Sequence, residues 1–369
     1  MKKYLLLILF FAAQFSFAQN VNIPDENFKS ALISAGYDTG GDGEISVSEA
    51  EAVTGMIMVN RKKIVSVEGI EAFVNTIGLS CIGNDISSMD LSANTSLMYL
   101  SCSRNGLTSL DLSANPALEK LSCSSNELNS INVSANPELD YLSCSLNNLT
   151  DLNLSSNPKL ITLNCGSNDI TSLDLSANTA LVELYCKKNE LSVLDVSANT
   201  QLSILSMEVN SVPVIDLSSN LELTELYCSS NDMTELDVSA NINLTNLSCD
   251  KNLLMSICVS DVAAAEANVD FVKDFDAVWL DTCGQNALGI NDSDNTYVSV
   301  YPIPAVNLLN IDLKVKAVGT VYDMNGKVIM DGIKLSKGHN ELNLDLIPQK
   351  YFLMITGQGL AKTLSFVVM

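Results

Sequence analysis

A 21-residue pattern of apolar and polar positions dominates the chain. Written as a template it reads L-x-x-L-x-C-x-x-N-x-L-x-x-L-D-L-S-x-N-x-x. Copies begin, with no insertion between them, at Leu97, Leu118, Leu139, Leu160, Leu181, Leu202, Leu223 and Leu244, after an earlier copy that begins at Thr76 without its first Leu. The L-x-C and L-D-L runs alternate apolar and polar residues with period two, so each copy predicts two short strands with one buried face. Two asparagine columns, Asn84–Asn252 and Asn94–Asn241, mark the turns. A single coil cannot bury its own leucines, so the pattern predicts a stack of coils.

The flanks of the repeat depart from this pattern. Residues Pro24–Tyr37 predict a short helix that Asp25 can cap, and 56–73 predict an irregular first coil. The tail carries several short β runs and the hairpin signal Asn325-Gly326, which together predict a small β-sandwich. The expected division is 1–18, signal peptide; 19–55, helical N-terminal cap; 56–258, solenoid; 259–283, C-terminal cap; 284–296, linker; 297–369, sandwich. The predicted fold class is mainly β.

Charge and hydropathy argue against nucleic acid as a partner and against a membrane-spanning protein. The chain of 369 residues has a formal net charge of −23, and an acidic surface repels nucleic acid and anionic membranes. Its first residues, Met1–Ala18, combine lysines, an apolar run and small residues, which predicts a cleaved export signal. No later stretch is apolar enough for a membrane span. We therefore expect an exported protein that binds no nucleic acid and does not span a membrane.

Eight of the ten cysteines occupy one position of the repeat. Side chains in such a column are spaced like the strands themselves, which is too far apart for a good disulfide, and a line of thiols does not make the tetrahedral cluster that zinc needs. We expect them to be small apolar filler in the core. Cys258 and Cys283 lie outside the column and are the predicted disulfide.

Residues 38–49, DTGGDGEISVSE, match the spacing of a twelve-residue calcium loop. The expected ligands are the side chains of Asp38, Asp42, Ser46 and Glu49 and the main-chain carbonyl of Glu44. Gly40 stands where the pattern has Asp or Asn, so one ligand would have to be water and the affinity would be weak. The alternative is an acidic glycine turn that binds no metal.

The repeat resembles the leucine-rich-repeat family, and in particular the internalin-type surface repeats of bacteria. The tail resembles the C-terminal sorting domain of type IX secretion cargo of Bacteroidetes. The matching segments are Val300–Pro304, Leu309–Ile311, Val321–Lys327 and Tyr351–Leu353. This resemblance implies export through the periplasm to the outer cell surface or medium, with the type IX secretion machinery as a partner.

Catalytic chemistry has little support in the sequence. The only histidine, His339, lies in the tail, and no H-E-x-x-H, Walker or G-x-G-x-x-G motif occurs. Paired carboxylates without a cleft are solvated surface. We expect no catalytic residue and no enzyme activity.

The third, fifth and seventh positions of L-x-x-L-x-C-x-x-N point away from the core, and in solenoids that surface is the usual binding face. Its tyrosines and nearby lysines are the predicted ligand-binding residues: Tyr99, Tyr141, Tyr185, Tyr227, Lys187 and Lys188. The competing interpretation is that tyrosine simply packs well on a strand. The leading hypothesis is a secreted binding protein for a protein or glycan. The alternatives are a structural spacer of the envelope matrix and an accessory module of a surface enzyme complex.

Overall fold

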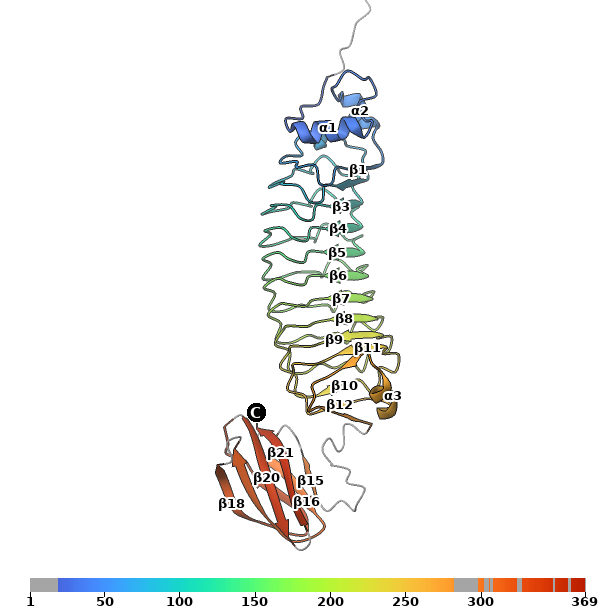
Figure 1. Ribbon diagram of the computed structural model, residues 1–369. Coiled ribbons are helices and arrows are strands. Elements are labelled where there is room, and N and C mark those ends of the chain that lie inside the picture. Colours follow the sequence, from blue (N-terminus) through green and yellow to red (C-terminus); the bar gives the residue numbers. More distant parts are fainter. Residues whose placement is uncertain are drawn as a thin grey trace, which may run out of the picture. The chain divides into compact units, whose positions relative to one another are not determined.

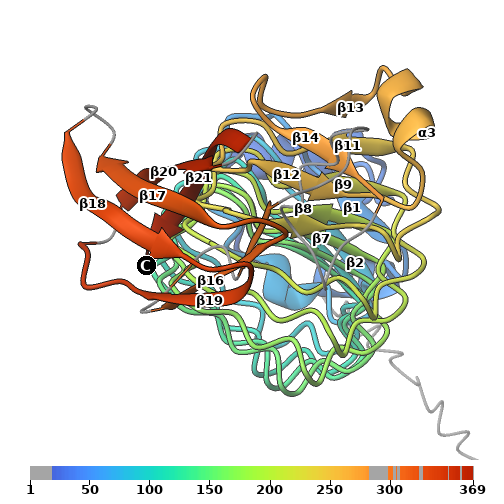
Figure 2. The ribbon, with the colours of Figure 1, turned by 90° about the horizontal axis from the view of Figure 1, so that it is seen from below.

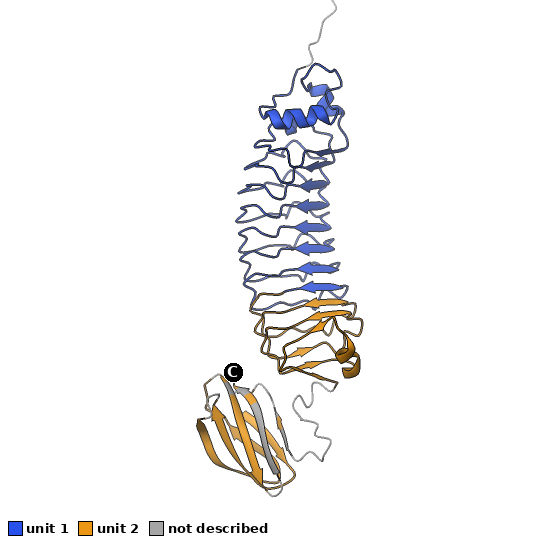
Figure 3. Cartoon of the chain, viewed as in Figure 1, with its two compact units in different colours: residues 1–207 blue, residues 208–369 orange. Residues whose placement is uncertain are grey.

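A computed structural model describes residues 19–281, 298–301, 305, 308–323, 327–347, 349–357 and 360–368. The predicted signal peptide and the predicted linker 284–296 lie outside these residues. The chain divides into two compact units, residues 1–207 and 208–369 (Figure 3). The predicted fold class is confirmed, since both units are mainly β and the repeats form a solenoid. In the described part of the chain, no helix is long and apolar enough to cross a membrane.

Two helices open the first unit, α1 (Glu26–Ser34) and α2 (Val47–Ala52). Asp25 caps α1: its Oδ1 accepts hydrogen bonds from the amides of Asn27 and Phe28, both at 2.9 Å. Its Oδ2 accepts from the amides of Val65 and Ser66 in the first coil, at 2.7 and 3.0 Å. Burial alone would raise the pKa of Asp25, but these four donors outweigh it and leave the pKa below its usual value. One carboxylate therefore starts the helix and fastens it to the solenoid.

Three-residue parallel strands make up the sheet of the first unit, one for each coil, with a 3₁₀ turn η1 (Ile70–Ala72) after the first. The strands are β1 (Met56–Met58), β2 (Gly78–Ser80), β3 (Tyr99–Ser101), β4 (Lys120–Ser122), β5 (Tyr141–Ser143), β6 (Thr162–Asn164), β7 (Glu183–Tyr185) and β8 (Ile204–Ser206). Figure 1 shows β3–β8 one above the next along one side of the coils. The register advances by one repeat at each step, so that Leu100, Leu121 and Leu142 lie side by side. Equivalent residues therefore form columns.

The second strand predicted for each coil was wrong for most repeats. Leu110 and Leu112 are buried as the alternation predicts, yet no ladder forms there. Asp111 accepts a hydrogen bond from the amide of Ser113 at 2.9 Å, and the same turn recurs from Asp90 to Asp237. Such a bond from a side chain to the amide two residues on forms a turn at the end of the expected strand. The same repeat position holds Asp or Asn in each of these coils, Asn132 and Asn153 included, and the turn gives that column a structural role.

The core consists of the leucine columns and the cysteine column. The eight cysteines of the repeat are free and buried, as predicted for core filler, and burial raises the pKa of Cys81 and Cys165 to about 12. The first asparagine column joins the coils. Asn147, for example, donates to the carbonyls of Cys123 and Cys144 and accepts from the amide of Leu128. These amides satisfy main-chain groups that the short strands leave out.

The residue before each asparagine of that column is left-handed, with φ between 54° and 58°. The set is Arg104, Ser125, Leu146, Ser167, Lys188, Val209, Ser230 and Lys251. Gly83, at the same position of the first regular coil, has φ 68°. Only glycine adopts this conformation without cost.

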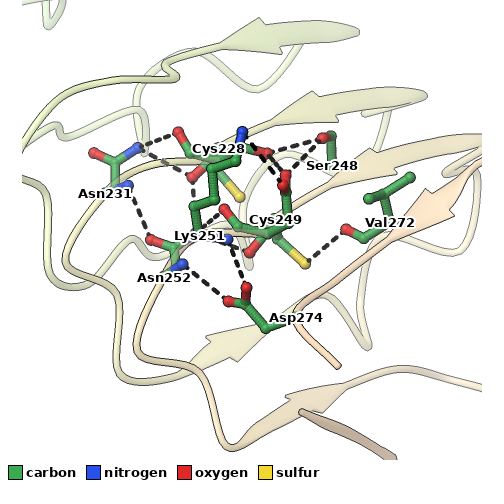
Figure 4. Close-up of polar contacts among 10 residues, drawn as sticks. Cys228, Asn231, Ser248, Cys249, Lys251, Asn252, Val272 and Asp274 are labelled. Atoms are coloured by element: carbon green, nitrogen blue, oxygen red, sulfur yellow. Dashed lines mark hydrogen bonds and ion pairs between the residues drawn. The ribbon is translucent and has the colours of Figure 1, made fainter. Parts of the chain in front are cut away.

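The second unit begins with the last coils and a cap. Its elements there are β9 (Glu225–Tyr227), β10 (Leu236–Asp237), β11 (Asn246–Ser248), β12 (Ser256–Cys258), α3 (Val262–Ala267), β13 (Phe271–Val272) and β14 (Val278–Leu280). Parallel pairs join β9 to β11 and β11 to β13, and β10 to β12 and β12 to β14. Asp274 accepts hydrogen bonds from the amides of Lys251 and Asn252 at 2.7 and 2.9 Å (Figure 4). It supplies the acceptor that a further coil would otherwise provide.

The tail forms a sandwich of two antiparallel sheets (Figure 2). Its strands are β15 (Val298–Tyr301), β16 (Leu308–Leu313), β17 (Ala317–Asp323), β18 (Val328–Leu335), β19 (Gly338–Asn343), β20 (Gln349–Gly357) and β21 (Leu360–Val368). One sheet has the order β15-β16-β19 and the other β18-β17-β20-β21. Both contribute to a core that contains Leu309, Leu353 and Phe366. Asn325 and Gly326 lie outside the described residues, but β17 and β18, on either side of them, pair antiparallel as the hairpin signal predicts.

Candidate ligand-binding face

The outward positions of β3–β8 and the residues that directly flank these strands form the candidate site, called here the strand face. Tyr99 of β3 and Tyr141 of β5 occupy the third repeat position, and the register pairs both with Lys120 of β4. Tyr185 of β7 occupies the fifth position, beside Asn164 and Ser206. All three tyrosines are half-buried. The fold therefore brings Tyr99 and Tyr141 into one column and places Tyr185 in the next.

Glutamates hold some of the tyrosine rings, a feature that the sequence analysis missed. The hydroxyl of Tyr99 donates to Oε2 of Glu119 at 3.1 Å, and this carboxylate raises the pKa of the phenol. In the second unit, Tyr227 donates to Glu225 at 2.8 Å. The signal was available for the second pair, because Glu and Tyr two residues apart on a strand share a face. The hydroxyl of Tyr141 makes no hydrogen bond to another described residue.

Serine hydroxyls fill the positions beside this column. Ser103 and Ser122 lie 2.8 Å apart through their Oγ atoms, as do Ser124 and Ser143. The hydroxyl of Ser145 donates to Ser124 at 3.0 Å. These contacts run from coil to coil, and the amide of Ser124 donates to Oγ of Ser103 at 3.1 Å, which links the two groups of hydroxyls. This arrangement is called here the serine ladder.

The strand face is close to neutral on an acidic chain. Between residues 97 and 188, the second, third, fifth, seventh and eighth repeat positions carry four basic and three acidic side chains, whereas the other positions carry one basic and six acidic. Lys120 and Asp140 form an ion pair at 3.5 Å. Lys187 and Lys188, predicted to contact a ligand, are exposed at the turn after β7. Tyr227 belongs to the second unit, so it is not included in this site.

The predicted calcium loop brings two carboxylates together at Gly40. A Cβ built on Gly40 would lie 3.4 Å from Oε1 of Glu49 and 3.9 Å from Oδ1 of Asp38. Glu49 accepts hydrogen bonds from the amides of Ser46 and Gly40 at 2.8 and 2.7 Å, and these donors lower its pKa to about 2.

The other expected calcium ligands lie around the same loop. Asp42 accepts from the amide of Glu44 at 3.0 Å, and the side chain of Glu44 forms an ion pair with Lys29 at 2.5 Å, which leaves its carbonyl as the expected ligand. Ser46 donates its hydroxyl to Glu49. Among the described residues, no three His, Cys, Asp or Glu side chains are grouped as a metal site. The donors are hard oxygens, as calcium requires, but only two carboxylates converge.

Two further predictions concern the second unit. Cys258 ends β12 and is buried, and it is not among the free cysteines. Cys283 lies outside the described residues, so the disulfide between them stays a prediction. His339 is exposed on β19 and lies 2.8 Å from Asp312 through Nδ1.

Comparisons with known proteins identify the tail directly. Residues 299–369 match the family described as secretion system C-terminal sorting domain. No curated protein matches the chain.

Solved structures that resemble the chain include three bacterial leucine-rich-repeat or internalin proteins. The functional domain of InlJ from Listeria monocytogenes, described as including a cysteine ladder, is 23% identical over 95% of this chain and 98% of that chain, with a TM-score of 0.43. A leucine-rich-repeat protein of Leptospira interrogans is 26% identical over 51% and 52%, with a TM-score of 0.49. The internalin InlF of Listeria monocytogenes is 19% identical over 74% and 100%, with a TM-score of 0.38. By its own coils, the chain is a leucine-rich-repeat solenoid whose C-terminal residues are a type IX sorting domain, which directs it to the cell surface.

Proposed function

We propose that the chain is a non-catalytic binding protein of the cell surface, whose strand face holds a protein or glycan ligand. The observation that supports this most is the column of Tyr99 and Tyr141 beside the serine ladder, on a nearly neutral face of the acidic repeats. Tyrosine offers a large contact area at a low entropic cost, and neighbouring serines leave the ring accessible. Glu119 holds the ring of Tyr99 in place before any ligand arrives, which reduces the cost of binding.

The test uses the full chain, immobilised and exposed to extracts of bacterial and host surfaces. We expect a captured ligand that the variant Tyr99→Ser, Tyr141→Ser, Tyr185→Ser, Tyr227→Ser binds roughly tenfold more weakly or worse, as is usual when aromatic anchors are removed. The circular-dichroism melt should change little, because these rings lie outside the leucine and cysteine core. Full affinity in this variant would move the ligand to another surface.

The sorting domain gives a second proposal, that the type IX secretion machinery recognises the sandwich. Its support is the family match over 299–369 and the separate core of the two sheets. Deletion of these residues should leave the repeats in the periplasm. Unchanged export of the deletion variant would contradict this proposal.

We also propose that calcium binds the 38–49 loop through Asp38, Glu49 and the carbonyl of Glu44, with Asp42, Ser46 and water completing the set. The support is the twelve-residue spacing together with the two carboxylates at Gly40. Titration calorimetry at millimolar calcium should detect binding that Glu49→Gln abolishes and that Glu51→Gln, a change of an exposed acid on α2, preserves. Absence of heat from the unaltered chain would leave the loop a simple turn.

A further inference from the structure

The geometry of the strand face points to one ligand class: we infer that it binds an extended, neutral polysaccharide that runs along the solenoid over Tyr99 and Tyr141. This inference rests on the binding function proposed above and names the chemical class of its ligand.

The spacing of the tyrosines is the first argument. Neighbouring parallel strands lie about 4.8 Å apart, and the register places Tyr99 and Tyr141 two strands apart in one column. One sugar unit of an extended polysaccharide is about as long as one such step. Two rings two steps apart therefore face every second sugar of a chain laid across the strands. The apolar C–H face of a sugar packs on the face of an aromatic ring through the hydrophobic effect and the negative charge of the ring face.

The serine ladder is the second argument. A hydroxyl donates and accepts, as sugar hydroxyls do, so the half-buried Ser103, Ser122 and Ser124 can either donate a hydrogen bond to a sugar or accept one from it. These hydroxyls are already linked across the coils at 2.8 Å, so little rotational freedom remains to be lost on binding. The ladder also repeats at the same interval as the strands. A polymer with a regular repeat can use all of it at once.

Charge and polarity are the third argument. With four basic and three acidic side chains, the strand face offers no field that would select a highly charged polymer, and the acidic remainder of the repeats repels polyanions. The centre of a protein interface is usually apolar. The third, fifth and seventh positions of the coils that begin at Leu97, Leu118 and Leu139 carry only Tyr, Lys and Ser. Neutral and hydroxyl-rich chemistry fits this surface best.

The test is affinity gel electrophoresis of the full chain against four soluble polymers. Xyloglucan and mixed-linkage β-glucan are neutral and extended, dextran is neutral and flexible, and polygalacturonate is anionic. We expect retardation by at least one of the extended neutral polymers, weaker retardation by dextran and none by polygalacturonate. No retardation by either extended neutral polymer would overturn the inference.

Three variants test the tyrosine register. Tyr99→Ala with Tyr141→Ala should weaken retardation at least about tenfold. Tyr141→Thr with Thr162→Tyr keeps the composition but moves the second ring one strand further, and it should weaken binding several-fold because the ring then faces the wrong sugar. The control Glu127→Ala with Asp169→Ala removes two exposed acids away from the strands and should leave binding of a neutral polymer unchanged. Binding that ignores the spacing variant would contradict the inference.

A parallel capture separates this inference from the proposed function. Surface extract treated with periodate keeps its proteins but loses most intact sugars. A ligand still captured from that extract, and lost in the Tyr99 and Tyr141 variant, would be a protein: the polysaccharide inference would be wrong while the proposed function stood. Loss of capture after periodate supports the inference. If neither polymers nor extracts show binding that depends on the tyrosines, both the inference and the proposed function fail.

Discussion

Removal of the Asp25 carboxylate should release the N-terminal cap, because this one side chain performs two tasks. Its Oδ1 caps α1 and its Oδ2 accepts two amides of the first coil. Loss of a capping side chain costs about 1 kcal/mol. Each amide left without its partner costs about 1 kcal/mol at the lower end of the range, which suits Val65 and Ser66 because their segment is only partly buried. Asp25→Ala should therefore destabilise the cap by about 3 kcal/mol.

Two further variants separate the contribution of the helix cap from that of the first coil. Asp25→Asn keeps an oxygen for the helix but turns an NH₂ group toward Val65 and Ser66, so it should cost about 2 kcal/mol. Asp261 caps α3 through the amide of Ala264 alone, at 3.0 Å, so Asp261→Ala should cost about 1 kcal/mol. The expected order of the three costs is the signature of a carboxylate that serves both a helix and a coil.

Hydrogen exchange measures these losses where they occur. Since about 1.4 kcal/mol corresponds to tenfold, Asp25→Ala should speed the exchange of α1 amides, such as that of Lys29, by on the order of a hundredfold, and Asp25→Asn by roughly thirtyfold. Asp261→Ala should change α3 by less than about tenfold. The reasoning is refuted if Asp25→Asn behaves as the unaltered chain, or if Asp25→Ala costs no more than Asp261→Ala.

Three other predictions follow from local geometry. Val209 is β-branched, 47% exposed and left-handed at φ 58°, so Val209→Asn should raise the free energy of unfolding by about 1 kcal/mol in a denaturant titration. The control Val193→Asn, at a 70% exposed site without this conformation, should leave it unchanged. Equal effects of the two substitutions would contradict the claim that Val209 is strained. The folded pKa of Glu49 is about 2 against an ordinary 4.5, so its contribution to stability is complete above about pH 4.5 and is lost as the pH falls toward 2; Glu49→Gln should flatten the melting temperature across that window, and an unchanged slope would contradict the assignment. Because the pKa of Cys81 is raised from 9.0 to about 12, its thiol should react with a thiol reagent at pH 8 about a thousandfold more slowly than an exposed cysteine. In guanidinium it should react at the ordinary rate. Fast labelling of the folded chain would contradict this prediction and show that the cysteine column opens.

The solenoid could be predicted because the 21-residue pattern recurs without insertion along the repeats. The leucine and cysteine columns and the turns at the two asparagine columns follow from spacing alone, and the β-sandwich of the tail follows from its short β runs. The second strand of each coil was predicted wrongly because alternation reports burial, and Leu110 and Leu112 are indeed buried. It does not report whether a ladder forms. The turn at Asp111 does not settle this either, because the same turn at Asp237 accompanies the pairing of β10 with β12. The signal for the turn itself, an Asp two residues before Ser, was present in the template.

The contacts of the candidate site depend on the three-dimensional register of the coils, which a single sequence does not reveal. The link between Tyr99 and Glu119 spans two coils, so it requires the register as well as the period. The left-handed residues are equally hidden, because Arg, Leu, Lys and Val at these positions give no sign of a positive φ. The same holds for the neutral strand face, which emerges only when repeat positions are sorted by the side of the coil on which they lie.

The two ends of the repeats show why the chain changes residue type where the period stops. Inside the stack an asparagine is needed, because Asn147 must donate to two carbonyls and also accept an amide; aspartate could not donate. At the first and last coils there are amides without a neighbouring coil to accept them, and a carboxylate, with two acceptor oxygens, is the better group. Asp25 takes two such amides in the first unit and Asp274 takes two in the second (Figure 4). Exchange of either aspartate for asparagine should therefore loosen its own end of the solenoid, although asparagine is the residue that every interior coil uses.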